Sequence, residues 1–169
     1  MSAVKKVVLI LLILCSCVGC DQVTKTVARN HLASSPPVYL VGDVFRLQYT
    51  ENAGALLGLG AGLPEAVRFW ALIVLVGVAL IGMLRFVWTS QEMNQMCITG
   101  IVLIIGGGFS NLLDRVLRGG AVIDFMNIGI GNLRTGIFNL ADLAIMTGVG
   151  IMLAWGVFFR DSDNEPSAP

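Results

Sequence analysis

Four apolar segments, each about twenty residues long, limit what this chain can fold into more than any other feature. They cover residues 7–28, 67–88, 96–117 and 137–159. A helix of that length crosses the hydrocarbon core of a bilayer. The composition agrees: 56% of the residues are hydrophobic and 13% are charged, against roughly 25% charged residues in a typical soluble domain. The sequence therefore predicts an all-α membrane protein, a four-transmembrane-helix bundle forming one membrane-embedded domain over residues 1–160.

The longest connection lies between the first two segments, over residues 29–66. It contains the strand-type runs 38–41 and 44–49, which are rich in Val, Tyr and Phe and flank the pair Gly42-Asp43. Such runs on either side of a turn predict a small β-hairpin or cradle. We therefore expect a small β-hairpin or cradle within this connection. The acidic tail, residues 161–169, has no apolar periodicity and is expected to be disordered.

The net charge and the cysteines exclude several kinds of partner. Eleven basic and eleven acidic residues give zero net charge, so there is no basic excess to neutralise a nucleic acid. The four cysteines, Cys15, Cys17, Cys20 and Cys97, all lie in or beside apolar runs. They are expected to be small buried hydrophobic residues without a disulfide. A metal site is not expected, because the first three lack a second ligand pair and do not share one helix face.

The first segment allows two interpretations. Lys5 and Lys6, an apolar run and the stretch from Cys17 to Cys20 resemble a lipoprotein export signal that would be removed. Alternatively the helix is retained, because it continues to Asp21 and Lys25, which fit a polar site.

Lys5 and Lys6 favour a cytoplasmic N-terminus, and four spans then return the C-terminus to the cytoplasm. The total count of Lys and Arg in the connections does not support this orientation, so it rests on the first helix. With it, the polar residues of helices one, three and four converge at the outer face, where the connections carrying Asn52 and Asp124 also lie. These helix residues are Asp21, Lys25, Asn111, Asp114, Arg115, Asn139 and Asp142.

Charged residues inside a bilayer are costly and need partners. Asp21 and Lys25 are four residues apart and share a helix face, and Asp114 is followed by Arg115. Each of these two acids has a neighbouring base, which favours a structural network that holds the helices together. The alternative is a hydrated pocket beneath the outer surface.

Asp124 and Asp142 have no basic residue within four positions. Two carboxylates that meet in an apolar environment hold one proton between them, because both cannot ionise cheaply. One can then take a proton from water while the other protonates a peptide carbonyl, as in aspartic proteases. Gly119, Gly120 and Gly136 give the Asp124 connection freedom to approach helix four.

At these residues the chain resembles the lipoprotein signal peptidase (signal peptidase II) family of intramembrane aspartic proteases. The matching blocks are Asp21-Gln22-Val23-Thr24-Lys25, Asn52-Ala53-Gly54-Ala55, Gly107 to Arg115 continuing to Val122-Ile123-Asp124-Phe125, and Phe138 to Ile145. The resemblance implies that Asp124 and Asp142 are the catalytic dyad. It places Asn52, Gly54, Asn111, Arg115 and Asn139 around the substrate or the dyad, and gives Asp21, Lys25 and Asp114 supporting roles in a polar network.

The resemblance also implies the reaction and the partners. The enzyme would hydrolyse the bond before a diacylglyceryl-modified cysteine of a prolipoprotein, without a metal or organic cofactor. It would act as a monomer among membrane lipids of the bacterial inner membrane, with both termini cytoplasmic and the active site facing the outer leaflet. Globomycin-type cyclic peptides would inhibit it. The resemblance also implies a small extracytoplasmic β-cradle between helices one and two, with a lid, over residues 37–66. The lid would be the segment around Gly58 to Gly62, for which a plain flexible turn is the alternative.

Three other interpretations compete. An ion or proton transporter also carries intramembrane Asp residues, but it needs polar groups throughout the membrane, and the inner halves of these helices are apolar. A non-enzymatic lipoprotein or assembly subunit would explain the stretch from Cys17 to Cys20. An intramembrane aspartic protease of another type is disfavoured, because the Gly-flanked Asp motif typical of it is absent.

Overall fold

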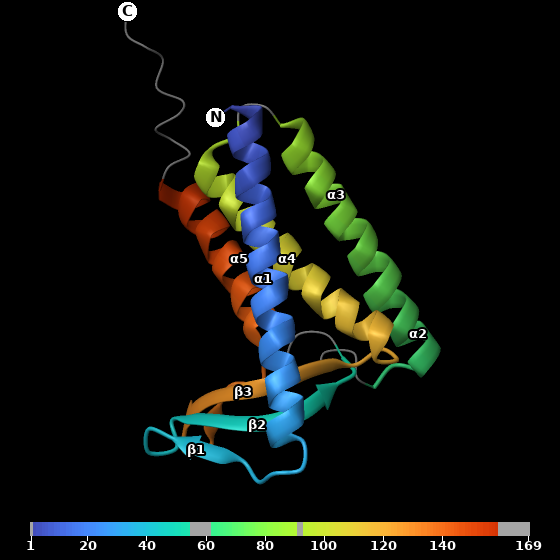
Figure 1. Cartoon of the computed structure of the whole chain (residues 1–169), viewed down its shortest axis with the longest axis vertical. Helices are drawn as coiled ribbons and strands as arrows, with labels where there is room; N and C mark the ends of the chain where they lie inside the picture. Colours follow the sequence, from blue (N-terminus) through green and yellow to red (C-terminus); the bar gives the residue numbers. More distant parts are fainter. Residues whose placement is uncertain (1, 55–61, 91–92, 159–169) are drawn as a thin grey trace, which may run out of the picture.

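The structure, a computed structural model, describes residues 2–54, 62–90 and 93–158. Four of its helices are long and apolar enough to cross a membrane, and they span Ala3–Leu32, Glu65–Thr89, Gln95–Leu117 and Leu140–Val157. They stand beside one another, and a small sheet lies across one end (Figure 1). The predicted lid around Gly58 to Gly62 lies largely outside the described residues, and the predicted disordered tail lies wholly outside them.

The helices are α1 (Ala3–Leu32), α2 (Glu65–Trp70), α3 (Val76–Thr89), α4 (Gln95–Leu117) and α5 (Leu140–Phe158). Between α2 and α3 runs the π-helical turn η2 (Ala71–Leu75), so that the three form one continuous span. Single π-turns inside helices are frequent at functional sites. The sequence indicated this span without its π-turn.

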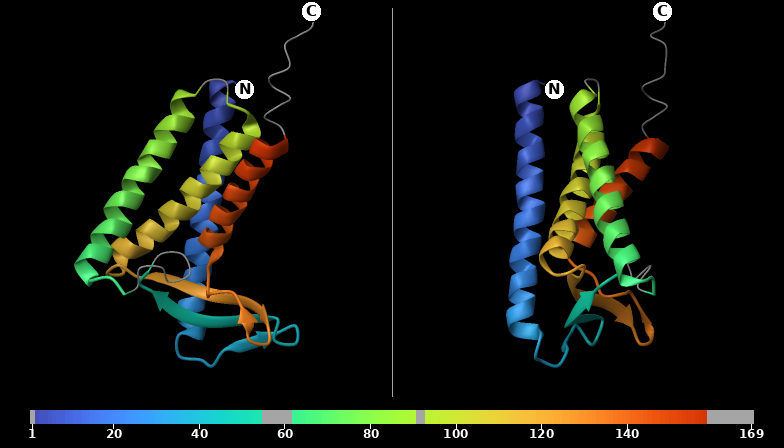
Figure 2. Two further views of the ribbon diagram at one scale, coloured as in Figure 1. Left: turned by 180° about the vertical axis from the view of Figure 1, so that it is seen from behind. Right: turned by 90° about the vertical axis from the view of Figure 1, so that its right-hand side faces the viewer.

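α4 is the centre of the helical part. Within its most apolar window 56% of the residues are buried, against 6%, 6% and 11% in the other three spans. Figure 2 shows α4 with α3 on one side, α5 on the other and α1 behind it. At the end away from the sheet, buried residues among those described form an apolar cluster of Ile10, Val87, Ile98, Ile101, Val102 and Ile105. The outer surfaces of α1, α3 and α5 remain apolar and exposed, as lipid contact requires.

The sheet has four antiparallel strands in the order β1-β2-β3-β4. β1 (Val38–Leu40) and β2 (Phe45–Asn52) come from the connection between helices one and two, as predicted. β3 (Val122–Ile130) and β4 (Leu133–Arg134) come from the connection between α4 and α5, which sequence analysis did not predict to be strands. The pairing of β2 with β3 therefore joins the two long connections into one layer.

Two glycines turn the chain from α4 into β3. Gly119 and Gly120 have φ of +63° and +98°, a region that residues with a side chain rarely adopt. The N–H of Gly120 donates to the carbonyl of Arg115 at 2.8 Å, which closes the end of α4 in the manner of a glycine C-cap. This tight ending places Asp124 directly beside the helix that it leaves.

Candidate active site

A cavity of about 160 Å³ lies where the sheet meets the helices, and Asp124 and Asp142 both line it. The remaining lining residues come from β2, β3, η2, α3, α4 and α5, and they are Asn52, Leu72, Val76, Gly108, Asn111, Arg115, Val122 and Ile145. The two acids are 2% and 9% exposed. The structure thus brings the two acids singled out in the sequence together in one small cavity.

Asp142 is held in the first turn of α5 by a reciprocal cap. Its backbone N–H donates to Asn139 Oδ1 at 2.9 Å, and the N–H of Asn139 donates back to Asp142 Oδ2 at 3.1 Å. This is the arrangement of a capping box, which satisfies two otherwise unpaired donors at a helix start. The fourth spanning helix was predicted to begin at Ile137. It is α5 and begins at Leu140, because Phe138 is extended and pairs with Met126 of β3.

An irregularity in the sheet orients the side chain of Asp124. Between the pairs Leu47–Met126 and Thr50–Asp124 the register of β2 and β3 shifts by one residue, which is a β-bulge, a feature common beside active sites. Beyond the bulge, Asn52 and Asp124 are diagonal neighbours on one face of the sheet. Asn52 Nδ2 donates to Asp124 Oδ2 at 2.9 Å across the two strands.

Each carboxylate oxygen of the pair accepts one amide N–H from the described part of the chain. Asp124 Oδ1 accepts from Asn139 Nδ2 at 2.7 Å, and Asp142 Oδ1 accepts from Asn111 Nδ2 at 2.9 Å. The other two oxygens are those already bonded to Asn52 and to the backbone of Asn139. Each oxygen keeps a second lone pair, which leaves room for a shared proton and for water.

The pKa of Asp124 is raised to about 6 from an ordinary value of 3.8, mainly by burial and further by the charge of Asp142. The amide donors of Asn52 and Asn139 oppose this rise because they stabilise the ionised form. A carboxyl group with such a pKa exchanges its proton near neutral pH.

Lys25 fixes the direction of the amides. It is fully buried, and its ammonium donates to Asn111 Oδ1 at 2.8 Å. An ammonium group has only donors, so it must face the oxygen of the Asn111 amide, and the NH₂ group of that amide is then left to face Asp142. Asn139 Nδ2 also donates to Asn111 Oδ1, at 3.2 Å. The donor chain therefore runs from Lys25 toward the two acids.

Asp21 joins α1 to the start of α5. Its Oδ2 lies 2.6 Å from Lys25 Nζ, and its Oδ1 accepts the N–H of Ala141 at 2.9 Å. A carboxylate at a helix N-terminus interacts favourably with the helix dipole. Two residues that the sequence did not assign to the network complete it: Ser110 Oγ donates to Asp21 at 2.7 Å, and Gln22 Nε2 donates to Ser110 Oγ at 3.0 Å.

Asp114 is not paired with its sequence neighbour Arg115, as the sequence suggested. It pairs with Lys25 at 2.9 Å and with Arg118 at 3.2 Å. Successive residues on a helix point about 100° apart, whereas residues four apart share a face. The spacing from Asp114 to Arg118 was therefore the available signal that we missed.

Arg115 instead lines the cavity. Its Nη2 donates to the carbonyl of Gly54 at 2.7 Å, and its Nη1 donates to the carbonyl of Asn111 at 3.3 Å. The N–H of Gly54 in turn donates to Asn52 Oδ1 at 2.9 Å. Within the described residues, the buried Nε–H of Arg115 has no hydrogen-bond partner. The cavity therefore holds a cation with a spare donor next to two acids.

The cysteines were expected to be buried, and three of them are not. Cys15 and Cys20 are exposed, Cys17 is half-buried and only Cys97 is buried. The reason is that α1 packs on α4 along one side, and the other side carries Cys15 and Cys20. None of the four forms a disulfide. Over the residues that the structure describes, no group of three or more His, Cys, Asp and Glu residues could hold a metal ion.

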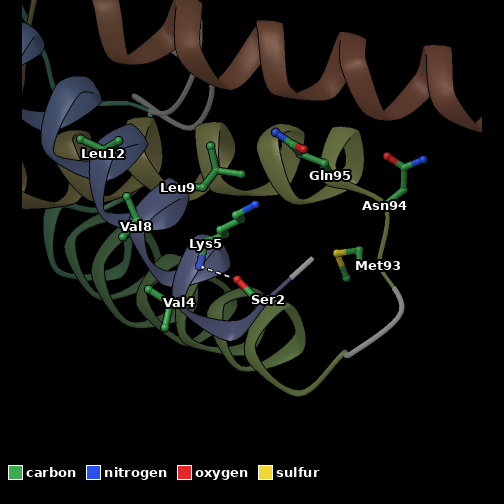
Figure 3. Close-up of a pocket in the computed structure, with 9 residues that line it drawn as sticks. All are labelled: Ser2, Val4, Lys5, Val8, Leu9, Leu12, Met93, Asn94 and Gln95. Carbon is green, nitrogen blue, oxygen red and sulfur yellow. Dashed lines mark hydrogen bonds between the residues drawn. The ribbon is translucent and has the colours of Figure 1, made fainter.

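A larger cavity, of about 750 Å³, lies between the start of α1 and the start of α4 (Figure 3). Its lining contains Lys5 as the one charged side chain and no acid. The smaller cavity is the candidate active site, because the buried acids and the buried amide donors meet there.

Comparison with known proteins identifies the family of this chain. The model of the family "signal peptidase (SPase) II" matches residues 13–159. A lipoprotein signal peptidase of Chlorobaculum parvum is 35% identical over 155 residues, which cover 86% of this chain and 91% of that protein. Another, from Clostridioides difficile, is 31% identical over 152 residues, covering 90% and 97%.

The fold is also found in a solved bacterial membrane enzyme, determined by the in meso method at 2.3 Å. It superposes with a TM-score of 0.79 at 24% identity, over 95% of this chain and 93% of that one. The family match runs from within the first helix to the end of the fourth, and the relatives are covered over most of their length. The chain therefore belongs to the signal peptidase II family of lipoprotein-processing membrane proteases.

Proposed function

We propose that this protein removes signal peptides from diacylglyceryl-modified prolipoproteins, and that Asp124 and Asp142 are its catalytic dyad. The observation that carries the proposal is that both acids line one small cavity and that every carboxylate oxygen of the pair accepts one amide N–H. Family membership supports the substrate class, and the geometry supports the aspartic mechanism.

The charges of the buried cluster favour a dyad with a single proton. Three cations surround it, Lys25, Arg115 and Arg118, and the acids number four with Asp21 and Asp114. Four acids that hold one proton carry three negative charges, which balance the three cations. Arg118 is partly exposed, with 22% of its side chain accessible, and the other charged groups are buried. A largely buried cluster without net charge avoids most of the cost of removing charge from water.

Hydrolysis follows from this proton count. The ionised carboxylate takes a proton from water while the water oxygen attacks the peptide carbonyl, and the protonated carboxyl gives its proton to the carbonyl oxygen. The tetrahedral gem-diol then returns a proton to one acid, and the other protonates the leaving amine as the C–N bond breaks. One water is consumed and the dyad again holds one proton. The Nε–H of Arg115, which has no partner among the described residues, donates to the substrate backbone in the cavity.

The site is proposed to face the outer leaflet, with both termini in the cytoplasm of a bacterium whose inner membrane holds the chain. The start of α1 and the end of α5 lie at the end opposite the sheet (Figure 1). A transporter is less well supported, because the core at that opposite end is apolar throughout the described residues. We further propose that the protein acts as a monomer within membrane lipids and that globomycin-type cyclic peptides occupy the cavity.

Substitution of the acids tests the proposal. Asp124→Asn and Asp142→Asn, each purified and reconstituted in lipid, should lose at least about a thousandfold in cleavage of a lipid-modified prolipoprotein. Thermal unfolding should show both variants folded. Asp43→Asn, at the exposed turn between β1 and β2, is the matched control and should cleave normally. Normal cleavage by either dyad variant would reject the aspartic mechanism, and an intact mass lacking the segment before Cys17 or Cys20 would favour the lipoprotein interpretation.

A further inference from the structure

A third cavity lies on the same face of α4 as the candidate active site. It measures about 460 Å³ and is lined by Phe86, Ser90, Met93, Cys97, Ile101, Met152 and Trp155. We call this cavity the inner cavity and the candidate active-site cavity the outer one. From α4, Cys97 and Ile101 line the inner cavity, and Gly108, Asn111 and Arg115 line the outer one. Their spacings of four, seven, three and four residues place all five on one helical stripe.

The same two helices form the walls of both cavities. The span formed by α2, η2 and α3 contributes Leu72 and Val76 to the outer cavity. Phe86 and Ser90, the C-cap residue of α3, line the inner one. α5 contributes Asp142 and Ile145 to the outer cavity and Met152 and Trp155 to the inner one. α1 contributes to neither. It packs on another side of α4, where Cys17 lies against Gly106, and Figure 2 shows it behind α4 when α3 and α5 flank that helix.

The depth of the inner cavity indicates what kind of group can reach it. From Asn111 to Ile101 and Cys97 is ten and fourteen residues, or about 15 to 21 Å along the helix. Half of the hydrocarbon core is roughly 15 Å thick. Acyl chains that enter at the outer leaflet therefore end near or before this depth, whereas a helix that crosses the membrane passes it.

We propose that the stripe of α4 between α3 and α5 binds the apolar helix of the signal peptide, and that the inner cavity receives one of its side chains. This rests on the proposed function, because the stripe is continuous with the dyad cavity and the substrate must enter that cavity from within the membrane. A signal peptide carries an apolar region of about 7–15 residues before its cleavage site. Its side chain about ten residues before the scissile bond lies at the inner cavity.

Photo-crosslinking in lipid vesicles tests the location. A benzoylphenylalanine is placed in turn at each position from about six to sixteen before the lipidated cysteine of a prolipoprotein, and the substrate is trapped on the Asp124→Asn variant. Crosslinks should peak about ten residues before the cysteine and map to the segments that contain Phe86 and Trp155. Crosslinks to α1, or no peak with position, would overturn the inference.

Cleavage of the same substrates by the unaltered enzyme separates the two ideas. Cleaved substrates that crosslink to α1 reject the binding stripe and leave the proposed function standing. Substrates that remain uncleaved reject the proposed function itself.

A filled cavity gives an independent measurement. Met152→Trp should raise the KM about tenfold for a prolipoprotein with Phe at the peak position and leave one with Ala there unchanged. The matched control is Leu153→Trp, at the adjacent residue of α5, whose side chain is 65% exposed; it should change neither KM. Equal effects of Met152→Trp on the Phe and Ala substrates would contradict the inference. If that variant does not fold, the crosslinking result decides.

Discussion

Asn139 caps the helix that carries Asp142, and the same side chain donates to Asp124. Its Oδ1 accepts the N–H of Asp142 at 2.9 Å, while its Nδ2 donates to Asp124 Oδ1 at 2.7 Å. One fully buried amide thus spans the two acids and also begins α5. A helix cap and a proposed catalytic contact therefore depend on the same residue, and substitutions can separate them.

Asn139→Ser should keep the cap and lose the amide donors. Serine is as good an N-cap as asparagine, whereas alanine costs about 0.5–2 kcal/mol. Asn139→Ser is thus expected to unfold at a higher temperature than Asn139→Ala, while both cleave prolipoprotein at least about tenfold more slowly than the parent. Thermal unfolding and cleavage assays measure the two effects. Equal stability of the two variants would show that the cap contributes little.

Lys25→Met should be strongly destabilising. It leaves Asp21 and Asp114 facing each other in a fully buried site without their shared cation, and the loss of one partner of a buried pair costs about 3–5 kcal/mol. The triple variant Asp21→Asn, Lys25→Met, Asp114→Asn has no uncompensated charge there and should recover part of that loss. Thermal unfolding in detergent compares the variants, and an equally unstable triple variant would contradict the electrostatic account.

The pH dependence of cleavage should follow Asp124. Because burial, together with the ionised Asp142, raises its pKa to about 6, the dyad takes up its single proton as the pH falls through that value, and above it no carboxyl group remains to protonate the peptide carbonyl. The rate is therefore expected to fall by about tenfold for each pH unit above about 6. Initial rates between about pH 4.5 and 8 with one lipidated substrate measure this, and a rate that stays constant up to about pH 8 would argue against Asp124 as the group that titrates.

The free energy of unfolding should also depend on pH through Asp124. The pKa of Asp124 is raised in the fold from 3.8 to about 6, so the folded state binds the proton more tightly. Its contribution to stability is fully present below about pH 4 and is lost as the pH rises through 6, by about 3 kcal/mol at most. Unfolding measured as a function of pH tests this. The difference in the free energy of unfolding between the parent and Asp124→Asn should change between about pH 4 and 6 and be constant above about pH 6.

Gly107 should not tolerate a side chain. A Cβ at this position would collide with the carbonyl oxygen of Ala141 and lie 2.8 Å from Ile145 Cγ1. Gly107→Ala should therefore push α5 away from α4, displace Asp142, and lower both stability and cleavage. Gly150→Ala is the control, because its Cβ would meet nothing within 4 Å, and it should be neutral or stabilising by up to about 1 kcal/mol. Similar behaviour of the two variants would contradict the close packing of the helices.

The four spans could be predicted from the sequence because twenty apolar residues have few alternatives to a membrane helix. Their ends were harder to predict. α1 continues to Leu32, four residues past the predicted end, because no Gly or Pro interrupts the polar stretch after the span. α5 begins three residues late because the residues before Asn139 extend to pair with β3. In both cases local polarity or tertiary pairing overrode the hydrophobic pattern.

The strand β3 shows why half of the sheet was missed. Its residues 122–127 are buried on both faces, so they lack the alternation of apolar and polar residues that indicates a strand. Their partner is β2, seventy or more residues earlier in the chain, and such a pairing leaves no local signal. The same limit applies to Asp21: its spacing to Lys25 was readable, but its bond to the N–H of Ala141 joins two helices that only the fold brings together.

The pairing of β2 with β3 also sets an order on biosynthesis. Asn52 leaves the translocation machinery long before Asp124 does, and the two meet only after both intervening spans have been inserted. Until then the edge of β2 has no partner, and an unpaired strand edge is a template for association with other chains. A nascent chain that stalls before Gly119 would therefore lack protease activity and be prone to aggregate. Activity is expected only after the connection between α4 and α5 has been synthesised.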